Sequence, residues 1–292
     1  MRTAIVNVTG FIGDILFASS LAEHLKKRYD RVLYQIQFYE PYELLMHNPF
    51  IDGVHVTNGN FISSGNFISF PDIDIFTCGE VDQSKPATTQ FQQACGIETT
   101  EDSKYIVYTN KHYDVIAQKR IALLKAKTQK QIVAYQESWE DRSFLFTKEE
   151  YERGIDIPPY GYGGRRRNIN FILQFLKEKY ALVSVGLQNG VQNGTLGLFD
   201  TSTYSMTASI IKNCDWMIGG EGGLTNLAAG VGTKTIITGD FIAQLYGWNG
   251  CIKKIKEPKM GPKTYFPNAG HVTLDPFLTD EEVAEQIRSI IG

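Results

Sequence analysis

The sequence is poor in cysteine and histidine, the residues that most often build zinc sites, disulfides and catalytic triads. Its 292 residues include only four cysteines, which are far apart and form no CxxC pair. This spacing indicates neither a zinc site nor a disulfide framework, and a reducing, cytoplasmic setting fits best. The five histidines stand singly, without the spaced partner that a zinc site or a Ser-His-Asp triad needs. We therefore expect no metal site.

Other patterns are also missing. No run of about 18 apolar residues is present, so nothing is expected to span a bilayer. The net charge of −3 gives no overall basic field that would by itself indicate a nucleic acid or membrane partner. The N-terminal glycines do not form GxGxxG, which disfavours a dehydrogenase. Asp72-Ile-Asp74 imitates a DxD metal motif, but it begins an apolar run with no third ligand nearby, so we interpret it as the start of a strand.

What the sequence does have is a regular alternation of short apolar runs with amphipathic segments. β-Branched and aromatic runs predict strands, and apolar residues at helical spacing predict helices. The expected strands cover residues 4–8, 32–38, 54–56, 73–76, 131–135, 181–185, 216–218 and 235–238, and the expected helices cover 15–25, 41–46, 86–96, 111–127, 168–179, 204–213, 224–230 and 279–291. Strands that alternate with helices form parallel sheets, so we expect an α/β protein.

The length of the chain fits two domains of ordinary size. We place the boundary near residue 128, with one Rossmann-like domain over 1–128 and a second over 129–292. A loop-rich insert, residues 142–167, holds two adjacent prolines and four glycines, and long irregular segments of this kind are often functional. The last helix opens with a capping-box pattern at Thr279 and is expected either on its own domain or packed back on the first.

The segment Thr9-Gly-Phe-Ile-Gly-Asp14 places one carboxylate between an apolar strand and an amphipathic helix. Gly10 and Gly13 allow a tight turn and a close approach of the backbone to a ligand. In open α/β sheets ligands bind at the carboxyl ends of the strands, which is where Asp14 is expected. The alternative is that Asp14 only caps the helix, and its position alone does not decide between the two.

A second candidate segment is residues 215–229, in which four glycines surround Glu221 between a strand and a helix. The start of such a helix offers unpaired backbone N–H groups and the positive end of the helix dipole, which suit a diphosphate. Glu221 can accept hydrogen bonds from ribose or sugar hydroxyls, as acidic residues do in other nucleotide sites. The alternative is a tight turn with no ligand.

These segments carry a family resemblance. Residues 13–29 and 40–54 resemble the amino-terminal half of the ADP-heptose heptosyltransferase-like glycosyltransferases of family 9, and residues 221–235 resemble their carboxy-terminal donor motif. The resemblance implies a GT-B architecture, in which two Rossmann-like domains face a central cleft and the second holds a nucleotide-sugar. It also implies inverting transfer without a metal ion, with the nucleotide-diphosphate-sugar as co-substrate and no other cofactor.

The resemblance also implies roles for individual residues. Asp14 matches the general base of the family, and Glu221 stands where the family has aspartate, so its longer arm can change the hydroxyl or the sugar that is contacted. The segment from Ser138 to Phe144 resembles a loop in which a family lysine contacts the phosphates, and Arg142 stands at that place. The expected substrate-binding residues are Gly10, Gly13, Ser138, Arg142, Glu221, Gly222, Gly223, Leu224, Thr225 and Asn226.

Two basic clusters leave the acceptor open. Arg165-Arg166-Arg167 and five lysines between residues 253 and 263 are by default solvated surface. On one rim of a cleft they would suit a polyanionic acceptor, whether a phosphorylated glycan or DNA. Arg165 and Arg167 could instead contact the donor phosphates.

The leading hypothesis is a cytoplasmic glycosyltransferase of hexosyl, pentosyl or heptosyl type. Its acceptor is either a glycan or lipopolysaccharide-type sugar or a hydroxymethylated base in phage DNA. The alternative is a non-catalytic module that binds a nucleotide-sugar on the same fold, because a fold does not establish an activity.

Overall fold

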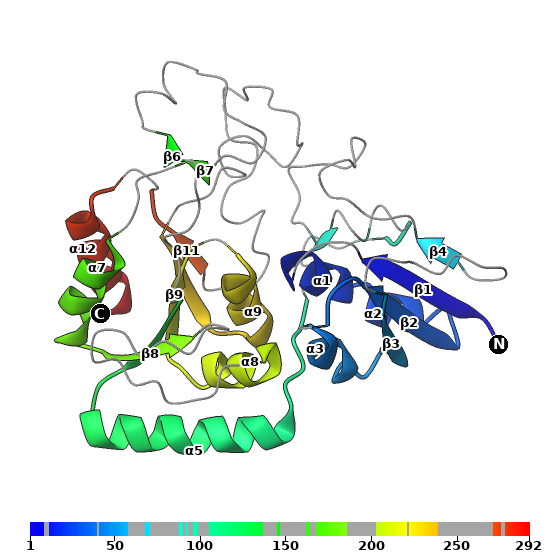
Figure 1. Cartoon of the computed structure of the whole chain (residues 1–292), viewed down its shortest axis with the longest axis horizontal. Coiled ribbons are helices and arrows are strands. Elements are labelled where there is room, and N and C mark those ends of the chain that lie inside the picture. Colours follow the sequence, from blue (N-terminus) through cyan, green and yellow to red (C-terminus); the bar gives the residue numbers. More distant parts are fainter. Residues whose placement is uncertain are drawn as a thin grey trace.

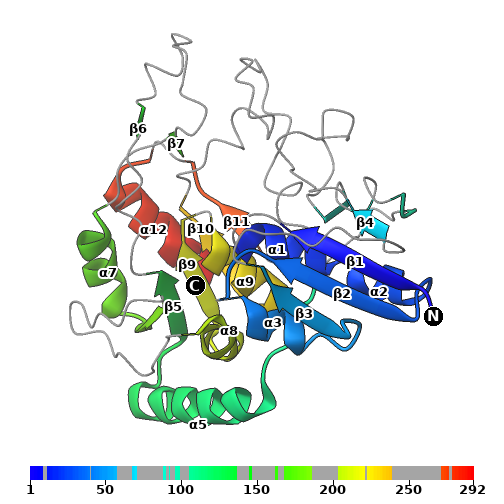
Figure 2. The ribbon, with the colours of Figure 1, turned by 45° about the vertical axis from the view of Figure 1, so that its right-hand side comes forward.

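The computed structural model of the chain describes residues 1–8, 12–39, 41–57, 68–70, 88–89, 92, 96–98, 105–136, 145–146, 162–163, 168–185, 203–220, 222–238, 271–275 and 278–292. Within these residues the strands form two larger sheets and one two-stranded pair. Figures 1 and 2 show the two larger sheets with helices between and around them. The neighbouring strands are parallel, which confirms the expected α/β class.

The first sheet has the strand order β3-β2-β1-β4. Its strands are β1 (Thr3–Val8), β2 (Arg31–Ile36), β3 (Gly53–Val56) and β4 (Ile68–Phe70), and its helices are α1 (Ile12–Ser19), α2 (Ala22–Lys26) and α3 (Tyr42–Met46). The last residue of β1, Val8, pairs with the last residue of β2, Ile36, so the loops after both strands leave the same edge. The strand expected at 73–76 and most of the helix expected at 86–96 lie outside the described residues.

The single helix expected over residues 15–25 is instead two helices, α1 and α2. Ser19 and Ser20 lie where α1 ends, and their hydroxyls donate to the carbonyl oxygens of Leu16 (2.6 Å) and Phe17 (2.7 Å). Serine hydroxyls that bond to preceding carbonyls compete with the backbone ladder and bend or interrupt helices. The apolar spacing is preserved across the break, because Leu21 and Leu25 are both buried.

The second sheet has the strand order β11-β10-β9-β5-β8. Its strands are β5 (Ile132–Gln136), β8 (Ala181–Val185), β9 (Trp216–Gly219), β10 (Lys234–Ile237) and β11 (His271–Thr273), and its helices are α5 (Lys111–Thr128), α7 (Ile169–Lys177), α8 (Tyr204–Lys212), α9 (Gly223–Val231) and α12 (Asp280–Ile291). The small strands β6 (Leu145–Phe146) and β7 (Tyr162–Gly163) pair within the loop-rich insert. None of the described helices is long and apolar enough to cross a membrane.

Helices cover both faces of the second sheet (Figure 2). Along β5, Val133 and Tyr135 pack with α7 and α12, whereas Ile132 and Ala134 belong to the cluster that includes α8 and α9. This alternation follows the two-residue period of a strand buried on both faces. The cluster on the α8–α9 side continues without interruption into the first sheet, where it includes Val6 and the other inward residues of β1 and β2.

The last helix packs on the second sheet. The Thr279 hydroxyl accepts from the Glu282 amide (3.2 Å), and the Glu282 carboxylate accepts from the Thr279 amide (2.7 Å), which completes the expected capping box. Val283 and Ile287 are buried in the same cluster as Ile172 of α7. Helix α12 therefore packs on α7.

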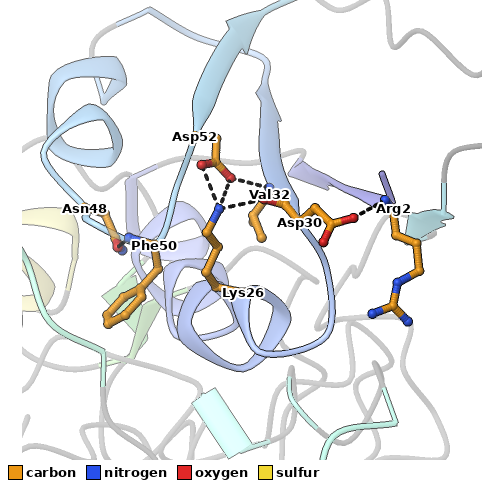
Figure 3. A network of polar contacts seen from close by, with 7 residues as sticks. All are labelled: Arg2, Lys26, Asp30, Val32, Asn48, Phe50 and Asp52. Atoms are coloured by element: carbon orange, nitrogen blue, oxygen red, sulfur yellow. Dashed lines mark hydrogen bonds and ion pairs between the residues drawn. The ribbon is translucent and has the colours of Figure 1, made fainter.

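In both sheets, an aspartate just before one strand bonds to the neighbouring strand and to a lysine. Asp52, just before β3, accepts a hydrogen bond from the first amide of the buried part of β2, Val32 (2.7 Å), and from the Lys26 ammonium (2.7 Å), as Figure 3 shows. Asp215, just before β9, accepts from the Ile132 amide of β5 (2.8 Å) and pairs with Lys125 of α5 (2.9 Å). In both sheets an aspartate thus ties the start of the neighbouring strand to the helix that precedes that strand.

A third ion pair joins α5 to α8. The Asp114 carboxylate, in the first turn of α5, accepts from Lys212 (2.7 Å) in the last turn of α8 and from the Thr109 hydroxyl (2.7 Å). An anion at a helix N-terminus and a cation at a helix C-terminus are each favoured by the helix dipole. The pair therefore stabilises both helix ends as well as their contact.

Candidate functional site

Strand order indicates where each sheet is able to bind a ligand. In the first sheet, β1 lies between β2 and β4, and in the second, β5 lies between β8 and β9. The chain therefore winds to opposite sides from these central strands, and ligands of open α/β sheets bind at the carboxyl ends of the strands at this switch point. Asp14 follows β1 and the turn Gly220–Gly222 follows β9. Both candidate segments thus lie at switch points.

Asp14 is the third residue of α1 and lies in its first turn. It is half-buried. A carboxylate at this position interacts favourably with the positive end of the helix dipole. It is inside the helix and does not hold the N-cap position, which precedes the first helical residue. Gly10 lies outside the described residues.

The N-terminal turns of α1 and α9 pack against each other (Figures 1 and 2). A Cβ atom added to Gly13 of α1 would lie 2.9 Å from Nδ2 of Asn226 on α9. A Cβ atom added to Gly223 of α9 would lie 2.0 Å from Cγ2 of Ile12 on α1. Each helix therefore offers a glycine at the point where the other presents a side chain. This close contact brings the first turn of α1, which carries Asp14, next to the start of α9.

The start of α9 has the properties expected of an anion site. Gly222 is its N-cap, and the helix itself supplies no carbonyl partner for the amides of Gly223 and Leu224. Thr225 and Asn226 are buried, with 0% and 1% of their surfaces exposed. The Thr225 hydroxyl is used within the turn, because it accepts from the Gly222 amide at 3.1 Å. Gly222 and Gly223 are partly exposed, whereas the Leu224 side chain is buried, so among the described residues of this turn a ligand would meet the backbone of the two glycines.

Asn226 joins the two halves of the chain. Its backbone oxygen accepts a hydrogen bond from the Tyr105 hydroxyl (2.6 Å), and the Tyr105 ring meets Phe17 of α1 edge to face, with 5.5 Å between ring centres. Among the residues that the structure describes, Oδ1 of Asn226 has no hydrogen-bond partner. Buried amide oxygens in this state are uncommon, and this one lies where α1 meets α9.

Tyr105 and Val107 were not identified as site residues from the sequence. The Val107 amide donates to the Gly230 carbonyl oxygen (2.9 Å), and a Cβ on Gly230 would lie 2.4 Å from Val107 Cγ2. The segment before α5 therefore lies directly on α9. Its signal in the sequence is the alternation Tyr-Ile-Val-Tyr over residues 105–108, in which Tyr105 and Val107 are buried and Ile106 is exposed.

Several predicted residues fall outside the described part of the chain. They are Ser138, Arg142, Glu221, Arg165, Arg167, the lysines between 253 and 263, and Asp72 and Asp74. Of these, Glu221 stands between two described glycines, Gly220 and Gly222. The roles expected for these residues remain predictions.

Within the described ranges, no group of three or more His, Cys, Asp and Glu side chains is close enough together to hold a metal ion. Cys214 is a free, buried cysteine whose thiol donates to the Ile210 carbonyl. Burial raises the pKa of this thiol, which keeps it protonated. Cys214 is therefore a packing residue just after the end of α8.

No protein-family model matches the sequence, and no curated protein matches it. Solved structures do match. A family 9 glycosyltransferase from Veillonella parvula superposes with a TM-score of 0.60 at 12% identity, covering 99% of this chain and 97% of that one. The Escherichia coli ADP-heptose lipopolysaccharide heptosyltransferase II superposes with a TM-score of 0.54 at 9% identity, covering 100% of this chain and 98% of that one. TibC from enterotoxigenic E. coli, in complex with ADP-D-β-D-heptose, superposes with a TM-score of 0.55 at 10% identity, covering 96% of this chain and 64% of that one.

TibC also corrects one expectation. The sequence and the family resemblance predicted a protein without a cofactor, but TibC is an iron-containing glycosyltransferase. The prediction was wrong because it took the absence of a cofactor as a property of the fold. This fold also occurs in a metal-containing protein.

The family resemblance found in the sequence is confirmed at the level of the fold. Over nearly its whole length, the chain matches structures of family 9 glycosyltransferases and heptosyltransferases at about a tenth of identical residues. The aligned part covers 99% to 100% of this chain and so includes both parallel sheets. The chain has the GT-B fold of these glycosyltransferases.

Proposed function

We propose that this protein is a glycosyltransferase that moves a sugar from a nucleoside diphosphate to an acceptor hydroxyl. The observation that carries this proposal is the contact between the first turns of α1 and α9, which brings the turn that carries Asp14 next to the start of α9. TibC, which shares the fold, is described in complex with ADP-D-β-D-heptose, and this supports a nucleotide-sugar as the donor.

On the donor side, the diphosphate would lie at the start of α9. The amides of Gly223 and Leu224 and the positive end of the helix dipole stabilise negative charge there. The departing nucleoside diphosphate gains charge as the glycosidic bond breaks, so donors fixed in advance lower the barrier. In this proposal residues 129–292 hold the donor, with Arg142 on its phosphates and Glu221 on a sugar or ribose hydroxyl.

On the acceptor side, residues 1–128 would present the hydroxyl to the donor. Asp14 removes its proton as the oxygen attacks the anomeric carbon, and the bond from that carbon to the diphosphate oxygen breaks on the opposite face. The configuration is then inverted. Inversion needs the base and the leaving group on opposite faces of the sugar, and the contact of α1 with α9 supports this scheme because it keeps the turn that carries Asp14 near the proposed diphosphate site.

The proposal is tested in two steps. A thermal-shift screen of nucleotide-sugars identifies the donor, because a ligand that binds only the folded state raises the unfolding temperature. With that donor, Asp14→Asn is expected to lower kcat by about 10²- to 10⁴-fold, the usual contribution of general acid–base catalysis. The affinity for the donor should change by less than about twofold, because the amide keeps the shape of the carboxylate. Unchanged turnover would show that Asp14 is not the base.

The control is Glu23→Gln, which makes the same chemical change on the exposed side of α2. This substitution should leave both kcat and the affinity for the donor unchanged. Glu221→Ala separately tests the donor side and should weaken nucleotide-sugar binding in a calorimetric titration. A protein that binds a nucleotide-sugar tightly but transfers no sugar to any acceptor would instead be a binding module on this fold.

The acceptor is either a glycan hydroxyl or a hydroxymethylated base in DNA. The arginines at 165–167 and the lysines between 253 and 263 would favour an anionic acceptor of either kind. Binding of duplex DNA through phosphate contacts weakens steeply with salt. If no duplex binding is seen, or if moderate salt leaves it unchanged, the DNA acceptor is excluded.

A further inference from the structure

The Thr225 side chain is fully buried and holds the turn that precedes α9. Its hydroxyl accepts a hydrogen bond from the Gly222 amide (3.1 Å), and its one proton lies within reach of the carbonyl oxygens of Gly222 (2.9 Å) and Gly220 (3.1 Å). These contacts connect the two residues that flank position 221 in the sequence. A single hydroxyl thus joins the end of β9 to the first turn of α9.

The methyl group of Thr225 packs against the end of β9, and this contact also holds the side chain in place. A Cβ on Gly219, the last residue of β9, would lie 2.9 Å from Thr225 Cγ2 and 3.2 Å from Gln136 Oε1. Gln136 is the last residue of β5, so the methyl packs at the switch point of the second sheet. With its methyl against β9 and its hydroxyl in the turn, Thr225 has no surface left for a ligand.

The hydrogen bond to Gly222 also determines which amides remain for an anion. The N-cap amide already bonds to Thr225, so the amides left for an anion begin with those of Gly223 and Leu224, which have no acceptor within the helix itself. If the turn relaxed, these amides would lose their common direction.

We propose that Thr225 is a positioning residue for the donor diphosphate: its hydroxyl sets the turn from Gly220 to Gly222 and, through it, the direction of the first amides of α9. This inference rests on the proposed function and refines it, because it separates residues that contact the donor from the residue that holds them in place. It also replaces the expected direct contact of Thr225 with substrate by an indirect role.

Two substitutions separate the effect of the Thr225 hydroxyl from the effect of the side chain's shape. Thr225→Ser keeps the hydroxyl and removes the methyl, whereas Thr225→Val keeps the shape and removes the hydroxyl. Thr235→Val is the matched control, because Thr235 is also fully buried in the second sheet and its hydroxyl bonds to a backbone carbonyl, that of Thr233 (3.0 Å), away from the turn.

Two measurements are made on each full-length variant. Hydrogen exchange reports the protection of the Gly222 amide, and calorimetry reports the affinity for the nucleoside diphosphate, among ADP, GDP, UDP, CDP and TDP, that most raises the unfolding temperature of the wild type. We expect Thr225→Val to lose the protection and to bind the diphosphate about tenfold more weakly. Thr225→Ser and Thr235→Val should keep both within about twofold.

The outcomes distinguish this inference from the proposed function. Thr225→Val that loses protection at Gly222 but binds the diphosphate like the wild type would overturn the positioning role and leave the donor site intact. Equal weakening by Thr225→Val and Thr235→Val would attribute the effect to general loss of stability and would also overturn it. A wild-type protein that binds none of the five diphosphates would refute the donor site itself.

Discussion

The side chain of Asn226 occupies the space that a methyl group on Gly13 would need, with Nδ2 only 2.9 Å from where that carbon would lie. A second contact has the roles exchanged: here α9 supplies the glycine, Gly223, and α1 supplies the side chain, Ile12. Reciprocal glycines let the backbones of α1 and α9 approach closely at their first turns. The spacing between Asp14 and the start of α9 is therefore set by two residues without side chains.

Gly13→Ala should destabilise the protein by up to about 2 kcal/mol. Overpacking against Asn226 costs about 1–3 kcal/mol, and alanine returns about 1 kcal/mol of helix propensity. In an Asn226→Ala background the obstruction is gone, so the same change should be neutral or stabilising. Urea unfolding of the four proteins in this double-mutant cycle measures the coupling. Equal effects in both backgrounds would show that the contact is not responsible.

Gly223→Ala should be the more damaging of the two glycine changes, because its new carbon would lie 2.0 Å from a methyl group of the buried Ile12. We expect a loss of about 2–3 kcal/mol and weaker diphosphate binding, since α9 must move away from α1. The control is Gly53→Ala, whose new carbon meets only the flexible end of Leu33 at 3.2 Å, so it should cost less than about 0.5 kcal/mol. Thermal unfolding ranks the variants, and a smaller effect of Gly223→Ala than of Gly53→Ala would contradict the prediction.

The aspartates before β3 and β9 should contribute similarly to stability. Asp52→Asn and Asp215→Asn each remove an ion pair and weaken the cap of a strand amide. Because the lysine partners are partly exposed, we expect about 1 kcal/mol for each change, additive in the double variant because the two sites lie in different sheets. Chemical denaturation at neutral pH measures all three variants. Strong non-additivity would indicate that the two sites are coupled.

Acid should weaken the contact between α5 and α8. Burial alone would raise the pKa of Asp114, but hydrogen bonds from Lys212 and Thr109 outweigh it and hold the pKa below that of an ordinary aspartate. A depressed carboxyl pKa adds stability that is fully present above about pH 4 and disappears as the pH falls through the folded-state value. Asp114→Asn should therefore cost about 1 kcal/mol at pH 7 and progressively less below pH 4. A loss that stays constant down to pH 2 would rule out this linkage.

Much of the fold could be predicted from the sequence, because both periodicities are strong. Runs such as residues 181–185 and 216–218 are buried strands, and the helix expected over 111–127 is α5 almost to the residue. The capping patterns were also informative, as Thr279 shows. The break between α1 and α2 was not predicted, because apolar spacing continues across it and only the hydroxyls of Ser19 and Ser20 mark it.

The candidate site could be predicted only in part. A glycine-rich turn before a helix indicates an anion site, and Asp14 after a strand indicates the ligand edge, since both depend on neighbours in the sequence. The contact of Gly13 with Asn226 and the hydrogen bond from Tyr105 join residues far apart in the sequence, and no local pattern encodes them. The expectation that Thr225 contacts substrate came from its neighbours in the sequence alone, and these do not show that its hydroxyl bonds within the turn.

One apolar cluster runs from β1 through α1 and α9 to β5, so a single core is shared by the two sheets. Cutting the chain near residue 110 would separate Ile12, Tyr105 and Val107 from α9, on which they pack in the intact protein. Neither half then has a complete interior of its own. We therefore expect the two sheets to unfold together in a single transition.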